Sequence, residues 1–205
     1  MPDVACSFSD VVSLRDLDPE RIVQVHVMSR EYLIALLSGI SLEGAPDTHP
    51  YRGCTVEMMQ MDPRDLAIGQ TFVQRAKYQE LLERFGSILG NGFCTRSGIA
   101  QCGPLIVFGY DGSGVPCVAH YVPPIIEATG NRRFLIDGIH RNYVVRSVGG
   151  TIESVLIRDV SIPLPCDPVL WDEVRIVDEK PPRPDRFRNL RRELFRNTKF
   201  AGIDG

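Results

Sequence analysis

The sequence predicts an α+β fold, in which a mixed sheet with flanking helices carries an extension at each end. Two strand–turn–strand patterns follow each other between residues 104 and 137, so that neighbouring strands are joined by turns instead of by helices. Helical periodicity is confined to a few short segments. The 205 residues are 43% hydrophobic and 24% charged. This composition is typical of one globular domain with small additions.

The first part of the chain is expected to hold a strand, a helix and a second strand. Residues 16–27 predict a short strand that follows a turn. Ser29 can cap a helix that Gly39 ends, and residues 43–53 predict a loop through their Pro and Gly content. A further strand is expected at residues 56–61. The apolar residues at helical spacing in the predicted helix are Tyr32, Leu33, Leu36, Leu37 and Ile40.

A second helix is expected to follow a turn at Asp62 and Pro63. Residues 86–103 contain five Gly and no clear periodicity, which predicts a long loop that could serve as a lid or as the edge of a binding site. The predicted apolar face of the helix comprises Val73, Ala76, Tyr78, Leu81, Leu82 and Phe85, and its polar face comprises Gln74, Lys77, Glu80 and Glu83.

The remainder of the chain predicts two hairpins, a helix and a return strand. The first hairpin turns at residues 111–114 and the second at residues 129–131. The helix is expected at 139–148, where Gly149 and Gly150 provide its C-terminal signal. A strand should follow at 151–160. Leu170, Trp171 and Val174 are expected to dock the next segment, and a Pro-rich linker at 180–185 should lead to a short helix at 187–195.

The basic side chains are concentrated at the C-terminus. Residues 181–205 hold seven basic and three acidic side chains, whereas residues 1–180 hold 16 basic and 23 acidic ones. Such a basic tail could bind nucleic acid or a protein partner, or could lie on its own acidic domain. The basic residues are Arg183, Arg186, Arg188, Arg191, Arg192, Arg196 and Lys199.

The N-terminus, the apolar runs and the positions of Cys and His indicate the cellular compartment and the metals to expect. The N-terminus lacks the basic start and apolar core of a signal peptide, and no apolar run approaches the ~20 residues of a membrane helix. We therefore expect a cytoplasmic protein without a membrane partner. The six Cys include no C-x-x-C pair, and the four His do not stand at zinc-ligand spacing, so neither zinc nor haem is expected. Cys94 and Cys102 are the pair to test for metal or redox behaviour.

The stretch R-F-L-I-D-G-I-H-R-N-Y places unusual residues at a strand-to-helix corner. A helix that starts after Gly138 leaves its first N–H groups without helical partners, and glycine lets a ligand approach the backbone. His140 and Arg141 add donors beside the positive end of the helix dipole, which favours a phosphate site. Asp137 could bind Mg²⁺ or a hydroxyl group, or could cap the helix. An ordinary turn with a capping Asp is the alternative.

The pattern P-P-I-I-E, a Gly turn, R-F-L-I-D-G-I-H-R-N-Y-V-V, Gly-Gly and V-L-I-R-D resembles the core of the ParB/sulfiredoxin superfamily. Upstream, D-L-A-I-G-Q-T-F-V-Q-R-A-K is similar to the leading helix of some ParB-like members. The resemblance covers about half of the chain. It implies a ParB/sulfiredoxin-like core at about 62–162, within one domain at 1–180 that is followed by a basic tail at 181–205.

The resemblance also indicates which members of the superfamily fit. Ile139 stands where sulfiredoxins have the reactive Cys and where chromosome-partitioning ParB has a Glu, which argues against both activities. The closer likeness is to members with Asp-Gly-x-His-Arg, among them free-serine kinases that use a nucleotide. That likeness implies phosphate contacts from Gly138, His140 and Arg141. The remaining implied site residues are Asp137, Ile139 and Asn142 in the turn, and Gln70 and Lys77 as a second wall.

Two hypotheses follow. In the first, the protein binds a nucleoside triphosphate, ATP or CTP with Mg²⁺, and acts as a small-molecule phosphotransferase or hydrolase. Asp137 and His140 are then the catalytic candidates. In the second, the protein is a non-catalytic nucleotide-sensing or DNA-associated module that uses its basic tail. The kinase-like reading also requires an N-terminal carboxylate, for which the open choices are Glu20, Glu31, Glu57 and Asp62.

Overall fold

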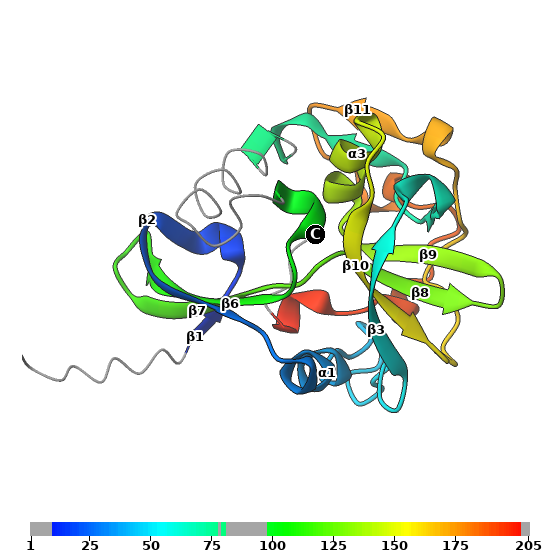
Figure 1. Cartoon of the computed structure of the whole chain (residues 1–205). Coiled ribbons are helices and arrows are strands. Elements are labelled where there is room, and N and C mark those ends of the chain that lie inside the picture. The colour runs from blue at the N-terminus through cyan, green and yellow to red at the C-terminus, as the bar shows by residue number, and fades with distance from the viewer. Residues whose placement is uncertain (1–9, 78, 81–97, 202–205) are drawn as a thin grey trace, which may run out of the picture.

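The computed structural model describes residues 10–77, 79–80 and 98–201. These residues form a mixed α+β structure with a four-stranded sheet, a five-stranded sheet and a two-stranded pair. Figure 1 shows the four-stranded sheet at one end of the molecule and the five-stranded sheet at the other. The predicted α+β class is therefore confirmed. Within the described residues, no helix combines the length and the apolar character that crossing a membrane requires.

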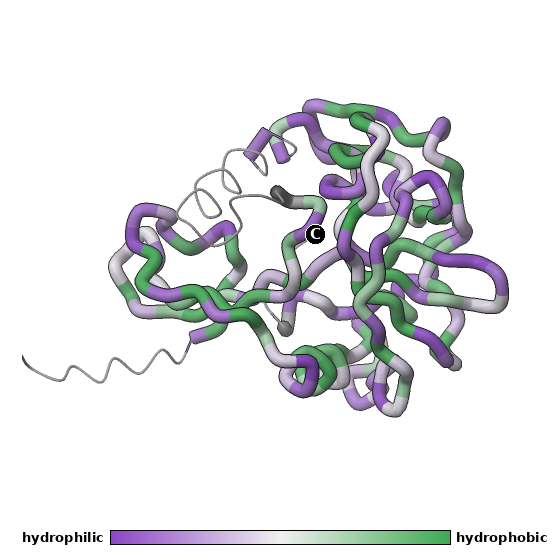
Figure 2. The backbone as a smooth tube through the Cα atoms, in the orientation of Figure 1, coloured by the Kyte–Doolittle hydropathy of each residue, from purple (hydrophilic) through white to green (hydrophobic). Residues whose placement is uncertain are grey.

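The five-stranded sheet carries the predicted strand-to-helix corner. Its strand order is β3-β10-β8-β9-β4, so β8 is the central strand. β10 pairs antiparallel with β3 and parallel with β8, which makes the sheet mixed. Figure 2 shows hydrophobic residues along these strands and a hydrophilic tip on the β8–β9 hairpin. The strands are β3 (Thr55–Met61), β4 (Ala67–Ile68), β8 (Ile125–Thr129), β9 (Arg132–Asp137) and β10 (Ile152–Arg158).

Helices cover the two faces of this sheet. α1 (Arg30–Ser38) packs on one face, where Leu33 and Leu37 share a core with strand residues such as Val155. α3 (Ile139–Ser147) packs on the other face, where Ile139 shares a core with Leu156. Because neighbouring strand residues point to opposite faces, Val155 and Leu156 serve different cores. Both helices agree with the predicted ones.

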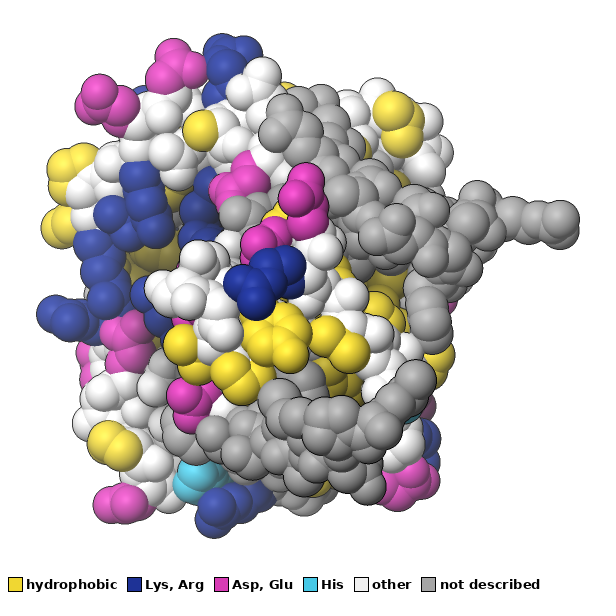
Figure 3. All heavy atoms as spheres, turned by 90° about the vertical axis from the view of Figure 1, so that its left-hand side faces the viewer, with side chains coloured by type: hydrophobic (Ala, Val, Ile, Leu, Met, Phe, Trp, Pro, Cys, Tyr) yellow, Lys and Arg dark blue, Asp and Glu magenta, His cyan; other side chains and the backbone are white. Residues whose placement is uncertain are grey.

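The four-stranded sheet has its own small core. Its order is β1-β7-β6-β2, and β6 and β7 form the predicted hairpin. Figure 3 shows the end of the molecule that carries this sheet, where hydrophobic, basic and acidic side chains are all exposed. Val23 and Val27 of β2 are among the exposed apolar side chains. The strands are β1 (Asp10–Val12), β2 (Leu17–Val27), β6 (Leu105–Asp111) and β7 (Pro116–Tyr121).

The predicted second helix starts later than expected. Val73 lies in β5 (Phe72–Gln74), which pairs in parallel with β11 (Arg175–Val177). Among the described residues of the predicted helix, 75–77 and 79–80 are helical. The expected positions Tyr78, Leu81, Leu82, Glu83 and Phe85, most of the 86–103 loop, and Cys94 lie outside the described residues.

Two predictions for the C-terminal part are wrong. Residues 187–195 form bridges and a 3₁₀ turn (Arg192–Leu194) where a helix was expected. Leu170 does not dock, since it is 65% exposed. Trp171 is buried, and its indole N–H donates to the carbonyl oxygen of Pro63 at 2.6 Å. Val174 packs against the same core.

Candidate functional site

The corner between β9 and α3 depends on glycine. Gly138 is the N-cap of α3 and has a φ of 93°, in the left-handed region. A Cβ at this position would lie 2.9 Å from Cβ of Pro124 and 3.0 Å from Nη2 of Arg141. Any side chain would therefore meet both backbone strain and a steric clash. The side chains of Pro124 and Arg141 occupy the space that glycine leaves free here, so the approach of a ligand to this backbone stays a prediction.

The guanidinium of Arg141 is buried and forms hydrogen bonds within the turn and to the neighbouring strand segment. Its Nη2 donates to Oδ2 of Asp137 at 2.8 Å, and its Nη1 donates to the carbonyl oxygen of Val122 at 2.6 Å. The side chains of Arg141 and Asp137 are 5% and 8% exposed. The guanidinium also lies over the ring of Tyr121. Asp137 thus pairs with Arg141 one helical turn later, and α3 has no side-chain cap.

His140 is buried and neutral at ordinary pH. Its Nε2 lies 3.1 Å from the backbone nitrogen of Gln74, which can only donate, so the ring proton of the neutral form is on Nδ1. Burial lowers the pKa of His140 to about 3, with smaller contributions from the charges of Lys77, Arg141, Lys180 and Arg15. Among the described residues, Nδ1 has no hydrogen-bond partner. His140 therefore offers one buried N–H donor.

Asn142 and Ile139 complete the first turn of α3. The Asn142 side chain donates to the carbonyl oxygen of Gly138 at 3.0 Å, so it closes the turn from within. Its Oδ1 is buried without a partner among the described residues. Ile139 packs in the core between α3 and the sheet. Both residues thus stabilise the corner itself.

A cavity of about 140 Å³, here called the corner cavity, adjoins the turn. Asp137, Gly138 and Ile139 line it together with Gln70, which comes from a separate segment. Gln70 is one of the two residues expected in the second wall of the site, and it lines this cavity. His140, Arg141, Asn142 and Lys77 are not among its lining residues. The C-terminal part supplies Pro165, Cys166, Phe187, Phe195, Arg196 and Thr198.

The four candidates for the N-terminal carboxylate of a kinase-like site lie outside the corner cavity. Glu20 and Glu31 are exposed, on β2 and α1. Glu57 pairs with Arg158 at 3.1 Å. Asp62 caps a 3₁₀ turn, and hydrogen bonds from Arg64 lower its pKa to about 2. None of these four residues lines the corner cavity.

The described residues contain no group of three or more His, Cys, Asp or Glu side chains placed to hold a metal ion. Asp137 is the acidic side chain among the described residues that line the corner cavity. A Mg²⁺ ion that arrived with a nucleotide could use this carboxylate, because Mg²⁺ commonly binds one or two carboxylates together with substrate phosphates.

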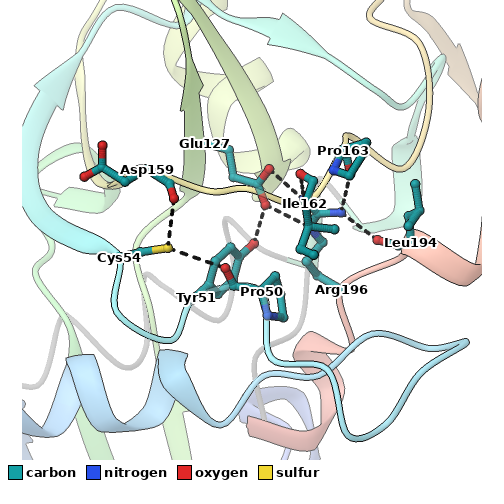
Figure 4. Close-up of polar contacts among 9 residues, drawn as sticks. All are labelled: Pro50, Tyr51, Cys54, Glu127, Asp159, Ile162, Pro163, Leu194 and Arg196. Atoms are coloured by element: carbon teal, nitrogen blue, oxygen red, sulfur yellow. Dashed lines mark hydrogen bonds and ion pairs between the residues drawn. The ribbon is translucent and has the colours of Figure 1, made fainter.

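A buried polar cluster beside the cavity was not predicted. Glu127 lies in the central strand β8 and is fully buried, and Arg196 is 3% exposed. Arg196 donates from Nε and Nη2 to the two Glu127 oxygens at 2.8 and 2.9 Å, and Tyr51 donates to Oε1 at 2.8 Å (Figure 4). Burial raises the pKa of Glu127, and the charge of Arg196 opposes that shift. The acidic residue in the apolar run I-I-E-A was the available signal, although its partner lies 69 residues away.

Comparisons of the chain with family models, with curated proteins and with solved structures found no match. The assignment of a function therefore depends on the geometry of the corner and on the resemblance of its motif.

Acidification should destabilise the protein through His140. As the pH falls below about 6.5, the unfolded chain takes up a proton at this residue, whereas the folded chain does not until about pH 3. The unfolded state then binds more protons, so the free energy of unfolding should fall by about 1.4 kcal/mol per pH unit. This contribution is complete above pH 6.5 and is lost as the pH falls towards 3.

Urea unfolding of the wild type and of His140→Gln between pH 7 and 5 measures the effect. Gln can accept from the same backbone N–H but does not titrate. The variant should show a flatter dependence on pH, and parallel curves for the two proteins would contradict the assignment of a neutral, buried His140.

Proposed function

We propose that the chain is a ParB/sulfiredoxin-like α+β domain that binds the phosphates of a nucleotide at the start of α3. The observation that carries the proposal is the left-handed Gly138, which brings the first turn of a helix to the wall of a cavity. Helix N-termini present N–H groups and partial positive charge, both of which favour phosphate. Gln70 adds a side-chain amide from a separate segment; its Nε2 donates to the carbonyl oxygen of Phe72 at 2.8 Å and has a second N–H that a ligand could use.

The roles within the proposed site differ from those that the motif implied. The backbone at Gly138 and Ile139 and the amide of Gln70 would contact the ligand, because these groups line the cavity. Arg141 acts as a positioning residue, since its two terminal nitrogens already bind Asp137 and the carbonyl oxygen of Val122. His140 fixes the first turn of α3 against Gln74.

Nucleotide binding is the first step of the proposal, and catalysis is a second step that needs more from the site. A phosphotransferase or hydrolase needs a group that orients or activates the attacking oxygen. Asp137 is the carboxylate available among the described lining residues, and it is neutralised by Arg141. A kinase-like or hydrolytic activity with ATP or CTP and Mg²⁺ therefore forms the second step of the proposal, and depends on Asp137.

The alternative of a DNA-associated or sensing module draws less support from the tail. Arg183 and Arg192 both lie within ion-pair distance of Glu43, Arg188 pairs with Glu173, and Arg196 pairs with Glu127. Charges held in this way are less available to release counterions from nucleic acid.

Calorimetric titration with ATP, ADP, CTP and GTP, with and without Mg²⁺, tests the proposal. At least one nucleotide should bind with a dissociation constant below about 1 mM. Gln70→Ala should weaken that binding about tenfold, the usual effect of losing one hydrogen bond to a charged group. Gln79→Ala, an exposed amide outside the corner cavity, is the matched control and should leave it unchanged. Absence of binding by all four nucleotides at millimolar concentration would contradict the proposal.

A further inference from the structure

The C-terminal segment forms one wall of the corner cavity. Residues 186–198, here called the strap, supply Phe187, Phe195, Arg196 and Thr198 to the lining. The opposite wall is the turn 137–139 at the start of α3. The ring centroids of Phe187 and Phe195 are 5.0 Å apart, so the two ends of the strap meet over the cavity.

The strap has little internal structure and is held mainly by the body of the protein. Its backbone carbonyl oxygens accept hydrogen bonds from N–H groups of three separate segments: Thr71 donates to Arg186, Asp167 donates to Arg188, and Glu43 donates to Phe195. Within the strap only two short 3₁₀ turns form, at Arg192–Leu194 and from Thr198. Its position therefore depends on contacts that can be broken without unfolding a helix or a sheet.

The two ends of the strap are anchored unequally. Arg196 is fixed by the buried pair with Glu127. Upstream, the ion pairs of Arg183 with Glu43 and of Arg188 with Glu173 are partly exposed, and such pairs contribute little to stability. Residues 186–195 are also held by the backbone hydrogen bonds described above, and these bonds would have to break for the segment to move while Arg196 stays in place.

The size of the cavity creates the need for such a movement. The corner cavity has about 140 Å³, whereas sites for drug-sized ligands and cofactors occupy about 300–1,000 Å³. A single phosphate or a small ring fits a space of this size, but a whole nucleotide does not.

We propose that the strap gates the corner cavity, so that residues 186–195 must lift about the fixed Arg196 before a nucleotide can enter. This inference rests on the proposed function for the identity of the ligand, but the movement itself can be measured without one. The closed strap lowers the apparent affinity, because only the open fraction of the protein can bind.

The thiol of Cys166 is a built-in probe of the movement. It lines the cavity and is 1% exposed, as is Cys117 in β7 of the other sheet. Reaction with N-ethylmaleimide, followed at each cysteine by peptide mass spectrometry, should label Cys166 faster than Cys117. Lifting of the strap exposes only Cys166, whereas global unfolding exposes both.

A loosened variant, in which the strap is held less tightly, should increase the labelling rate of Cys166. Arg183→Ala/Arg188→Ala removes one partly exposed ion pair of the strap and one just before it, and Cys166 should label about threefold to tenfold faster. The rate at Cys117 should stay unchanged. The apparent nucleotide affinity should rise by the same factor, although the variant has lost two positive charges. Arg64→Ala/Arg158→Ala removes two partly exposed ion pairs whose arginines do not line the corner cavity, and should change neither quantity.

Each outcome separates the two proposals. Equal labelling of Cys166 and Cys117, or a Cys166 rate that the loosened variant does not change, would overturn the gate even if nucleotide binds. Faster labelling of Cys166 without nucleotide binding to any variant would support the gate and overturn the proposed ligand. Faster labelling with unchanged nucleotide affinity would overturn the role of the strap in ligand entry.

Discussion

Replacement of Arg196 by alanine should lower the free energy of unfolding by about 3–5 kcal/mol, as expected when one partner of a buried ion pair is removed. The Glu127 carboxylate would keep the Tyr51 hydroxyl as a donor but would lose both guanidinium hydrogen bonds. Glu127 lies in the central strand with no exposed surface, so the substitution would leave a buried carboxylate with a single donor. Urea denaturation at pH 7 measures the change.

Two further variants determine whether burial is the cause. Arg192→Ala removes an arginine from the same segment whose side chain is 75% exposed, and should leave the urea midpoint close to that of the wild type. The triple variant Tyr51→Phe/Glu127→Leu/Arg196→Met replaces the polar cluster by apolar groups and should recover most of the loss. A loss below about 1 kcal/mol in Arg196→Ala would show that Glu127 has other compensation.

Arg141→Ala should be comparably destabilising, by about 3–5 kcal/mol. The substitution leaves Asp137 without its ion-pair partner and removes the donor to the carbonyl oxygen of Val122. Arg141→Lys should recover only part of the loss, because one ammonium group cannot reproduce a fork that reaches two acceptors. Thermal or urea unfolding of the wild type, Arg141→Ala and Arg141→Lys measures the order of their stabilities.

The control for Arg141 comes from the same strand-to-helix unit. Arg132 is exposed at the start of β9, and Arg132→Ala should change stability very little. If Arg141→Ala were as stable as the wild type and lost only nucleotide binding, Arg141 would be a ligand contact and its positioning role would be wrong.

The local parts of the fold were predictable because their signals are local. Ser29 accepts from the backbone N–H of Tyr32, as an N-cap should, and the turn at Gly138 takes the left-handed conformation that favours glycine. Val73 was misassigned because its segment pairs with β11, a hundred residues further along the chain. No periodicity within 70–85 contains that information.

The candidate site was predictable only in part, for a related reason. The motif located the corner and Gln70, but the internal pairing of Asp137 with Arg141 was not foreseen, because both residue types also suit phosphate or Mg²⁺. A short terminal helix was expected at 187–195. The distant partner of Arg196 instead holds this segment against the sheet.

The pair of Glu127 and Arg196 has a consequence for synthesis of the chain. A ribosome makes β8 long before residue 196, so the central strand emerges with a carboxylate whose partner has not yet been made. Although domains generally fold in order from the N-terminus, this sheet cannot close around a neutralised Glu127 until residue 196 has left the ribosome. We therefore expect the final packing of the five-stranded sheet to wait until residue 196 has been synthesised.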